Sequence, residues 1–297
     1  MKRHLSVASC FLALTLQAAG SARADDLPAG VMKTQQATKG TESVATSGFE
    51  AKAAKPDDAT SKDAMELKLS AGGLVSAGNA RSTAITSSGK FRIRRESNQL
   101  SVAVAQNYGR AASTPDADTA VTVENYQGRT RYDRFLSGGL AVFVAMSGVR
   151  DRFLGLDLRL NFDPGVAYYF VDEAKQQLWS EVGYDLQYDF RRTDKVLEAF
   201  NKGTPIDKAE TRHSGRLFLG YQNNLSKAVT ADAGIEYIQA LSKTENWRMN
   251  GFVGLTSQIG GDFSIATVFN LKYDNNPLPG VKNTDIITSI SLVYSLL

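Results

Sequence analysis

The chain alternates apolar and polar residues over long segments, and this alternation constrains its fold more than any other feature of the sequence. The clearest segment spans residues 156–170. Its apolar positions are Leu156, Leu158, Leu160, Phe162, Val166, Tyr168 and Phe170, and its polar positions are Asp157, Arg159, Asn161 and Asp163. Because successive side chains of a β-strand point to opposite faces, this pattern predicts a strand with one apolar and one polar side. Residues 178–190 and 263–273 repeat it.

Twelve such segments follow one another from residue 65 to residue 297, separated by Gly, Asn, Asp and Pro. They span residues 65–77, 80–95, 98–111, 119–133, 137–151, 156–171, 176–190, 211–223, 228–241, 244–258, 262–274 and 284–297. The alternation is weakest in the second and fourth segments, where Arg and Lys crowd together, so a bulge or a shifted boundary is expected there. The predicted fold class is all-β: a twelve-stranded antiparallel barrel.

The length of these segments favours a transmembrane barrel over a soluble secreted β protein, which is the alternative. The segments average about 13 residues, more than twice the length of an ordinary strand. No run of 18 apolar residues occurs, which excludes a spanning helix but not a barrel, whose strands need only about 9 to 11 residues. The three longest connections, near 112–118, 191–210 and 275–283, all follow odd-numbered segments and would share one side of the membrane.

Aromatic residues lie near the ends of many segments, where the interfacial girdle of a barrel would place them. They are Tyr108, Tyr132, Tyr168, Tyr188, Tyr221, Tyr237, Trp247, Tyr273 and Tyr294. The last segment carries Ile290, Leu292, Tyr294 and Leu296 on one face, which resembles the C-terminal strand read by barrel-insertion machinery. The expected partners are therefore the lipid bilayer of the outer membrane and that machinery. The residues indicate no particular oligomeric state.

The first 24 residues predict a secretory signal peptide. Lys2 and Arg3 precede an apolar run, and Ala22-Arg23-Ala24 provides a cleavage site. Residues 25–64 show no sustained period and predict a flexible periplasmic segment, with a short helix near residues 49–54 as the alternative. The predicted organisation is a signal peptide (1–24), this segment (25–64) and the barrel (65–297).

Charge and cysteine content argue against two other classes of protein. The net charge of +3 is accounted for by the three cations of the predicted signal peptide, so the exported chain lacks the basic surface of a nucleic-acid-binding protein. Cys10 is the only cysteine and lies within the signal peptide. The exported chain would therefore have neither disulfides nor thiol chemistry.

Three short runs resemble one known family. They are Ser76-Ala77-Gly78-Asn79, Tyr132-Asp133-Arg134-Phe135-Leu136 and, most specifically, Arg150-Asp151-Arg152-Phe153-Leu154-Gly155-Leu156-Asp157-Leu158-Arg159. Over roughly residues 65–297, the chain resembles the salt-induced outer-membrane proteins of YdiY type. The resemblance implies a Gram-negative outer-membrane barrel connected with salt stress. It implies no mechanism, because that family is a domain of unknown function. The long segment before the barrel and the terminal Leu297 depart from the family pattern.

No catalytic, metal or cofactor site is predicted. An outer-membrane hydrolase of phospholipase type, the enzymatic alternative, needs a nucleophile and a base on the same face. His213 is the only histidine of the exported chain, and the adjacent Ser214 points to the opposite face of the strand. One histidine without cysteine disfavours zinc. Carboxylates such as Asp157 and Asp163 could serve glycoside hydrolysis or calcium binding, but a hydrated lumen wall explains them better.

The polar strand positions, together with several large side chains, are expected to line the lumen. The candidate residues are Asp157, Arg159, Trp179, Glu181, Asp185, Asp189, Arg212, Arg216, Arg248 and Lys272. Twelve strands lie between barrels that side chains fill and barrels that leave an aqueous channel. The predicted function is non-enzymatic: a narrow pore for small polar solutes or ions, or an envelope-maintenance barrel. A plugged structural or binding barrel is the alternative.

Residues 191–210 predict a short helix in the longest outer connection, because Val196, Leu197, Ala199 and Phe200 can share a helix face. Such a helix could fold over the mouth of the barrel as a lid. A surface loop is the alternative.

Overall fold

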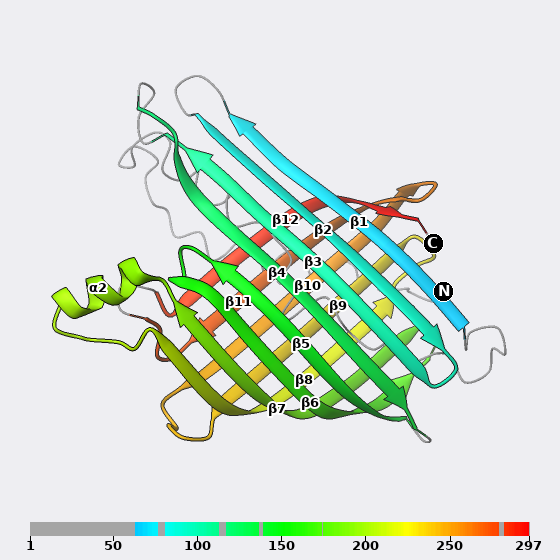
Figure 1. The fold of residues 1–297 in the computed structure, drawn as a ribbon. Helices are drawn as coiled ribbons and strands as arrows, with labels where there is room; N and C mark the ends of the chain where they lie inside the picture. Colours follow the sequence, from blue (N-terminus) through cyan, green and yellow to red (C-terminus); the bar gives the residue numbers. More distant parts are fainter. Residues whose placement is uncertain are drawn as a thin grey trace, which may run out of the picture.

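The computed structural model describes residues 63–76, 81–112, 117–136, 139–173, 175–278 and 282–296. These residues form twelve β-strands and one helix (Figure 1). The elements are β1 (Asp63–Ser76), β2 (Ser82–Arg95), β3 (Asn98–Ala111), β4 (Ala120–Phe135), β5 (Leu140–Asp151), β6 (Leu156–Asp172), β7 (Gln176–Arg191), α2 (Thr193–Asn201), β8 (Ala209–Asn224), β9 (Val229–Ala240), β10 (Trp247–Gly260), β11 (Phe263–Asp274) and β12 (Thr284–Ser295). Within these ranges, no helix is long and apolar enough to cross a membrane.

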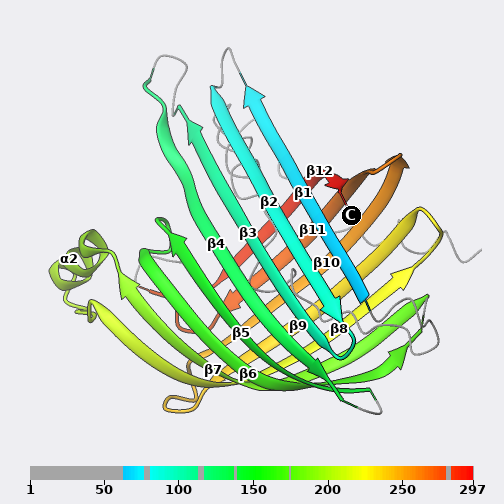
Figure 2. The ribbon, with the colours of Figure 1, turned by 45° about the vertical axis from the view of Figure 1, so that its right-hand side comes forward.

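The twelve strands close into one antiparallel barrel, which confirms the predicted fold class. Each strand pairs with its neighbours in sequence, and β1 closes the barrel by pairing with β12 (Figures 1 and 2). The observed strand limits lie within a few residues of the predicted ones. The predicted signal peptide and residues 25–62 of the predicted flexible segment lie outside the described residues, whereas Asp63 and Ala64 belong to β1.

The two ends of the barrel differ in their connections. Because the number of strands is even, β1 begins and β12 ends at the same end. We call this the turn end, because the strands are joined there by short connections such as the two residues Gly261 and Asp262 between β10 and β11. Gly261 has a φ of +53°, a left-handed conformation that a two-residue hairpin requires. The opposite end, the loop end, carries the long connections 112–119, 192–208 and 275–283.

The barrel places apolar side chains outside and charged side chains inside, the reverse of a soluble protein. On β7 the side chain of Val182 is 59% exposed, whereas Glu181 beside it is 2% exposed. On β6 Leu160 is 45% exposed on the outer face, whereas Asp163 is 6% exposed in the lumen. An exposed apolar belt around a closed sheet is stable in a lipid bilayer, where every backbone group must find its partner within the protein. The fold is that of an outer-membrane-type β-barrel.

Aromatic side chains form two rows on the outer face of the barrel, one near each end. At the loop end the Trp247 ring lies 4.9 Å from that of Tyr273 and 5.9 Å from that of Tyr237, between centroids. At the turn end the Phe263 ring lies 4.8 Å from that of Tyr294. Ten residues of β11 separate Phe263 from Tyr273, about 34 Å along the strand, or about 24–28 Å along the axis at a tilt of 35–45°. This spacing matches the apolar band of transmembrane barrels, about 25 Å tall.

Two expectations about local structure are wrong. Leu156, expected on the outer apolar face, is buried, because the β6–β7 register shifts between Leu156 and Leu158 and turns Leu156 inward. The second strand, β2, keeps an uninterrupted register with both neighbours, so its crowded cations reflect a lumen face and no bulge. In β4 the register does shift, at Thr122, away from the crowded arginines.

Glycines on the lumen side of the wall make room for aromatic rings that lie against it. A Cβ atom added to Gly165 would lie 2.5 Å from Cζ of Phe143 and 2.8 Å from the backbone oxygen of Val182. A Cβ atom added to Gly220 would likewise clash with the ring of Trp179, and one added to Gly234 would clash with the rings of Phe218 and Phe252. The lumen rings therefore pack on the wall of the neighbouring strand.

We expect Gly165→Ala to destabilise the barrel by about 1–3 kcal/mol, because the added methyl group overpacks a site bounded by a ring and by backbone. The urea midpoint of the refolded protein, followed by its mobility on unboiled gels, measures the change. Gly215→Ala is the matched control, since nothing lies within 4 Å of its added Cβ atom. Equal midpoints for the two variants would contradict this packing.

Candidate functional site

A cluster of eight buried hydrophobic residues, five of them aromatic, lies in the lumen. Its members are Ala141, Phe143, Ala167, Tyr169, Trp179, Phe218, Phe252 and Val268. Trp179 is 1% exposed and is the largest of the fully buried side chains. Its ring stacks on Tyr169 at 6.1 Å and tilts against Phe218 at 6.0 Å, both measured between centroids. These rings pack against one another inside the lumen.

A chain of buried ion pairs crosses the lumen over this cluster. Arg131 on β4 pairs with Asp133 (2.8 Å) on its own strand and with Glu181 (2.7 Å) on β7. Glu181 also accepts from Arg216 on β8 (2.7 Å), which in turn pairs with Glu236 on β9 (2.6 Å). We call these five residues the charge belt. Asn250 on β10 extends the belt by donating to Glu236 at 2.9 Å.

An aromatic ring packs against one of the arginines of the charge belt. The guanidinium carbon of Arg131 lies 4.0 Å from the centroid of Phe143, whose ring lies over Gly165. Strands β5 and β6 separate β4 from β7 in the sheet, so Arg131 reaches Glu181 across two intervening strands. Wall glycine, aromatic ring and guanidinium thus form three successive layers. Removing one partner from such a buried pair costs about 3–5 kcal/mol, because the other charge is left unpaired.

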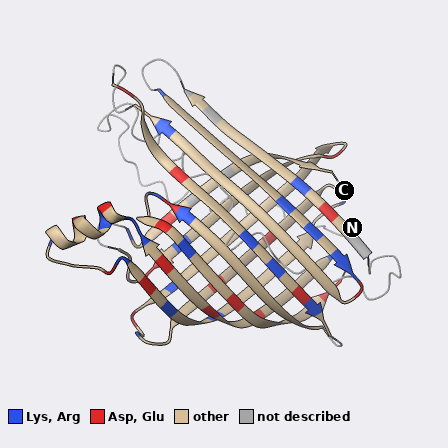
Figure 3. Cartoon of the chain, in the orientation of Figure 1, with Lys and Arg blue, Asp and Glu red and all other residues tan. Residues whose placement is uncertain are grey.

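Further ion pairs lie between the belt and the loop end. Arg159 donates twice to Asp189, at 2.6 and 2.7 Å. Asp185 accepts from Asn161 at 2.5 Å and faces Arg248 at 3.6 Å. Acidic and basic positions are interspersed along the strands in Figure 3. Most charges of this half of the lumen are therefore neutralised by an adjacent partner.

Two cavities lie on opposite sides of the belt. The turn-end cavity has a volume of about 530 Å³ and is lined by residues such as Lys68, Lys90 and Asp232. The loop-end cavity, of about 180 Å³, is lined by residues such as Arg248 and Lys272. Both walls consist mainly of charged, amide and hydroxyl side chains.

The barrier between the two cavities is thin. On β9, Asp232 lines the turn-end cavity and Glu236 lines the loop-end cavity. These residues are four positions apart, about 13 Å along the strand and less along the tilted barrel axis. Belt members Arg216 and Glu236 themselves form part of the loop-end wall. A few side chains therefore separate the two cavities.

The residues predicted to line the lumen occupy three environments. Trp179, Glu181 and Arg216 are buried in the centre, and Arg159, Asp185, Asp189, Arg248 and Lys272 lie between the belt and the loop end.

The other two predicted lumen residues lie nearer the loop end. Arg212 contacts Glu210 at 3.3 Å, and Asp157 pairs with Lys208 (3.2 Å) and Arg192 (3.7 Å) near the loop that holds α2. A role in contacting solutes stays a prediction for all ten residues.

Arg131 and Asp133 were absent from the predicted set although they form one end of the belt. The signal was present in β4, where Arg129, Arg131 and Asp133 alternate with period two. The many neighbouring charged residues of that segment made this period-two pattern hard to recognise. Lys68, Lys90 and Asp232 of the turn-end cavity were likewise absent, because single charges on strand ends resemble ordinary surface residues.

The histidine and the neighbouring serine do not form a nucleophile–base pair. His213 is exposed on the outer face, where Nδ1 contacts the hydroxyl of Tyr184, whereas Ser214 is fully buried in the lumen. Among the described residues, no three His, Cys, Asp or Glu side chains are placed to hold a metal ion.

The predicted helix in the longest connection is present as α2, but it lies to the side of the mouth. None of its residues lines the loop-end cavity, and Figure 1 shows it projecting beyond the strands. Hydrogen bonds from Lys195 and Lys202 lower the pKa of Glu198 to about 2. Desolvation raises the pKa of Asp194, but the hydrogen bond and the charge of Arg192, together with backbone hydrogen bonds, outweigh it and lower that pKa.

The most specific run of the sequence shapes the connection beside α2. Oδ1 of Asp151 accepts from the backbone N–H groups of Phe153 (2.9 Å) and Leu154 (3.0 Å). Gly155 adopts a φ of +75°, and its carbonyl accepts from the N–H of Arg192 at 2.8 Å. This run therefore builds a tight turn that anchors the α2 connection to β6.

One family profile and several solved structures match the chain. The profile of the family described as "Protein of unknown function, DUF481" matches residues 69–296. Among solved structures, the chain is similar to the NanC porin, with a TM-score of 0.44 and 10% identity over 77% of this chain and 97% of that one. It is also similar to the beta domain of the Bordetella autotransporter BrkA, with a TM-score of 0.39 and 11% identity over 78% and 98%. No curated protein matches the chain.

We expect His213→Ala to leave phospholipid hydrolysis by the refolded protein at the background rate, because His213 and Ser214 face opposite sides of β8. Release of fatty acid from mixed micelles measures this rate. Hydrolysis by the wild type that is lost in His213→Ala but retained in Gln239→Ala would overturn the non-enzymatic interpretation.

Proposed function

The chain belongs to the DUF481 family of proteins of unknown function, and we propose that it forms a constricted passage for small polar solutes or ions across the outer membrane. The single observation that carries this proposal is the pair of polar cavities that approach each other from opposite ends of the lumen. The charge belt is the constriction between them.

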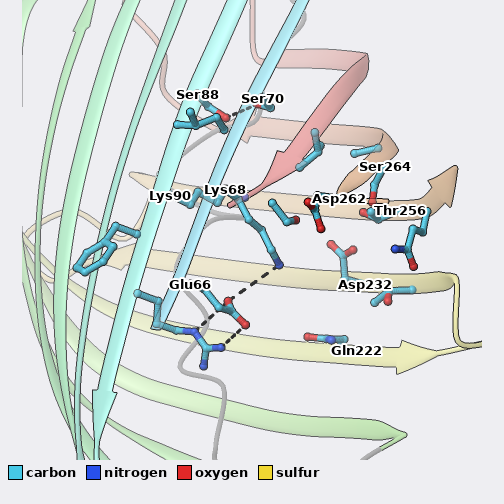
Figure 4. A pocket seen from close by; sticks show the side chains of 18 of the residues that line it. Glu66, Lys68, Ser70, Ser88, Lys90, Gln222, Asp232, Thr256, Asp262 and Ser264 are labelled. Carbon is cyan, nitrogen blue, oxygen red and sulfur yellow. Dashed lines mark hydrogen bonds and ion pairs between the residues drawn. The ribbon is translucent and has the colours of Figure 1, made fainter. Parts of the chain in front are cut away.

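The thinness of the barrier favours a passage over a purely structural barrel. A barrel filled throughout for stability would have side chains in the turn-end cavity of about 530 Å³ as well, but this space is left open with a mainly polar lining (Figure 4). Here the filled layer is limited to the belt and the aromatic cluster. Rearrangement of a few side chains, such as those of Arg216 and Glu236 at the edge of the loop-end cavity, would join the two cavities.

A plugged binding barrel is the second candidate. It is favoured by the unbroken series of ion pairs in the charge belt. Arg131 and Glu181 are nearly fully buried and form hydrogen bonds of 2.7 Å, so the belt at rest leaves no gap between them. In this version the cavities bind solutes without passing them. A measured current separates the two candidates.

We place the barrel in the outer membrane of a Gram-negative bacterium, reached by export with a cleaved signal peptide. The outward apolar belt supports the membrane location, and the basic, then apolar, start of the sequence supports export. The C-terminal strand, with Ile290, Leu292 and Leu296 on its outer face, would be read by the insertion machinery. The turn end would then face the periplasm.

The resemblance to salt-induced proteins of YdiY type adds a context for this passage. We propose that the protein acts in the envelope when external salt changes, as a passive route and not as an enzyme. Growth of a deletion strain with and without added salt would test the context separately from the passage itself.

We expect Trp179→Ala and Phe252→Ala to enlarge single-channel conductance, because each removes a large ring from the filled layer. Planar-bilayer recordings of the refolded mature protein measure it, after a comparison of unboiled and boiled gel mobility has confirmed folding. The wild type is expected to show small steps or none at rest.

Phe269→Ala is the matched control for these variants. It removes an aromatic ring of the same kind from the outer face of β11, where the ring is 43% exposed, and should leave conductance unchanged. Folded Trp179→Ala and Phe252→Ala proteins that carry no more current than the wild type would count against the passage and favour the plugged barrel.

A further inference from the structure

Exposed arginines gather on the rim of the barrel at the loop ends of β2 to β5. They are Arg81 before β2, Arg110 near the end of β3, Arg150 near the end of β5 and Arg152 in the turn that follows β5. Figure 3 shows basic positions at the arrowheads of β3 and β5 and an acidic position on β4 between them. We call these four arginines the rim patch.

Alternation along the strands directs the rim patch away from the lumen. Ala111, next to Arg110, is buried on the inner face of β3. Val149 and Asp151, on either side of Arg150, both line the loop-end cavity. The intervening arginine must therefore face outward. The patch lies on the lipid-facing side of the wall, outside both cavities.

Two arginines of the patch bond to uncharged partners. Arg110 donates to the carbonyl oxygen of Thr119 at 3.1 Å, and Arg81 donates to that of Ala117. Within the described ranges, neither guanidinium forms an ion pair with a carboxylate. A neutral carbonyl does not cancel the charge of a guanidinium, and it uses only part of its five N–H donors. Both arginines therefore keep charge and donors for a ligand.

Glu124 on β4 lies beside the other two arginines. Its Oε2 atom lies 3.3 Å from Nη1 of Arg152. Arg150 forms neither a hydrogen bond nor an ion pair with any residue that the structure describes. The described carboxylates on the outer side of this rim are Glu124 and the exposed Asp118. Four arginines against two carboxylates leave the rim patch positive.

Toward the middle of the barrel, the same strands present apolar side chains on the same face. Ile85 on β2, Val104 on β3 and Met146 on β5 are all exposed there. Each lies an even number of positions from the arginine of its strand. Tyr126 is exposed and faces Arg150 in register, as expected where the wall meets the lipid headgroups. A matching ligand therefore has an anionic head and an apolar tail.

The opposite side of the same rim has a different character. At the loop ends of β9, β10 and β11, outward positions are occupied by Gln239, Trp247 and Tyr273, which carry no charge. The outer face of the rim is thus cationic over β2 to β5 and mainly aromatic over β9 to β11. This asymmetry indicates a localised anion-binding surface and not a uniform band of headgroup contacts.

We propose that the rim patch binds the phosphate groups of lipids in the outer leaflet, whose acyl chains lie along the apolar wall of β2 to β5. Guanidinium groups bind phosphate through paired, charge-assisted hydrogen bonds, and cations at a bilayer surface attract anionic lipids. Continuity of the patch with the lipid-facing wall favours a lipid over a soluble phosphate. The inference uses the proposed orientation of the loop end toward the outer surface, but it is independent of conduction through the lumen.

Native mass spectrometry of the refolded mature protein in detergent micelles tests the proposal. The probes are lipid A with two phosphates, with one phosphate and with none. We expect each phosphate to tighten binding about twofold to fivefold, the gain from a partly exposed ion pair. Equal affinities for the three lipids would overturn the proposal. Displacement of lipid A by inorganic phosphate at the same concentration would overturn the assignment to a lipid.

Single substitutions locate the site on the barrel. Arg110→Gln and Arg150→Gln are each expected to weaken lipid A with two phosphates about twofold to fivefold and to leave the lipid without phosphate unchanged. Arg134→Gln is the matched control, because Arg134 is an exposed arginine at the turn end of β4. Losses of equal size in all three variants would show general attraction to a cationic protein and contradict a site at the loop end.

Glu124→Gln provides a test of opposite sign. The substitution removes a carboxylate from the patch and releases Arg152 from its ion pair, so the affinity for lipid A with two phosphates should rise about twofold. A folding defect cannot produce such a gain, and unboiled gel mobility confirms that each variant is folded. An unchanged or lower affinity in folded Glu124→Gln would refute the electrostatic basis of the site.

Discussion

The need to pair every backbone amide within the protein governs this structure. In the hydrocarbon of a bilayer no water is available for an unpaired N–H or C=O group, so a sheet can span it only when its edges meet. The pairing of β1 with β12 supplies that closure. Once the sheet is closed, alternation sends half of the strand side chains to lipid and the other half to the lumen. The distribution of apolar and charged residues follows from this requirement.

The lumen of a twelve-stranded barrel is too wide for the wall to close it and narrow enough for large side chains to do so. The chain solves this with layers. At Gly165 the wall has no side chain, so the Phe143 ring packs directly against the backbone there, and the guanidinium of Arg131 packs against that ring. The charge of Arg131 is then balanced by Glu181 from a strand that is not adjacent in the sheet. The charge belt therefore ties opposite walls together as well as closing the lumen.

Charge is arranged differently on the two sides of the belt, and this difference bears on function. On the loop side, pairs such as Arg159 with Asp189 neutralise each other over short distances and leave little field for a solute. On the turn side, Lys90 and Asp232 line the larger cavity from strands that are not adjacent in the sheet. A polar solute therefore meets charged side chains on both sides of the belt.

The sequence by itself determined the all-β class, the number of strands, their approximate limits and, for most of them, which face meets lipid. These features were predictable because alternation is local: each residue's face follows from its neighbours in the strand. The same locality placed Trp179 and Glu181 on the inner face and set His213 opposite Ser214. Only the tertiary structure decided which inward charges pair. Arg131 and Glu181 are 50 residues apart in the sequence. They meet because the curvature of the closed sheet and the register of its strands bring an inward side chain of β4 to one of β7, beside the ring of Phe143. A register shift that no local pattern specified turned Leu156 inward, and residues of β1 and β9 line one cavity only because the closed sheet brings these strands around the same lumen.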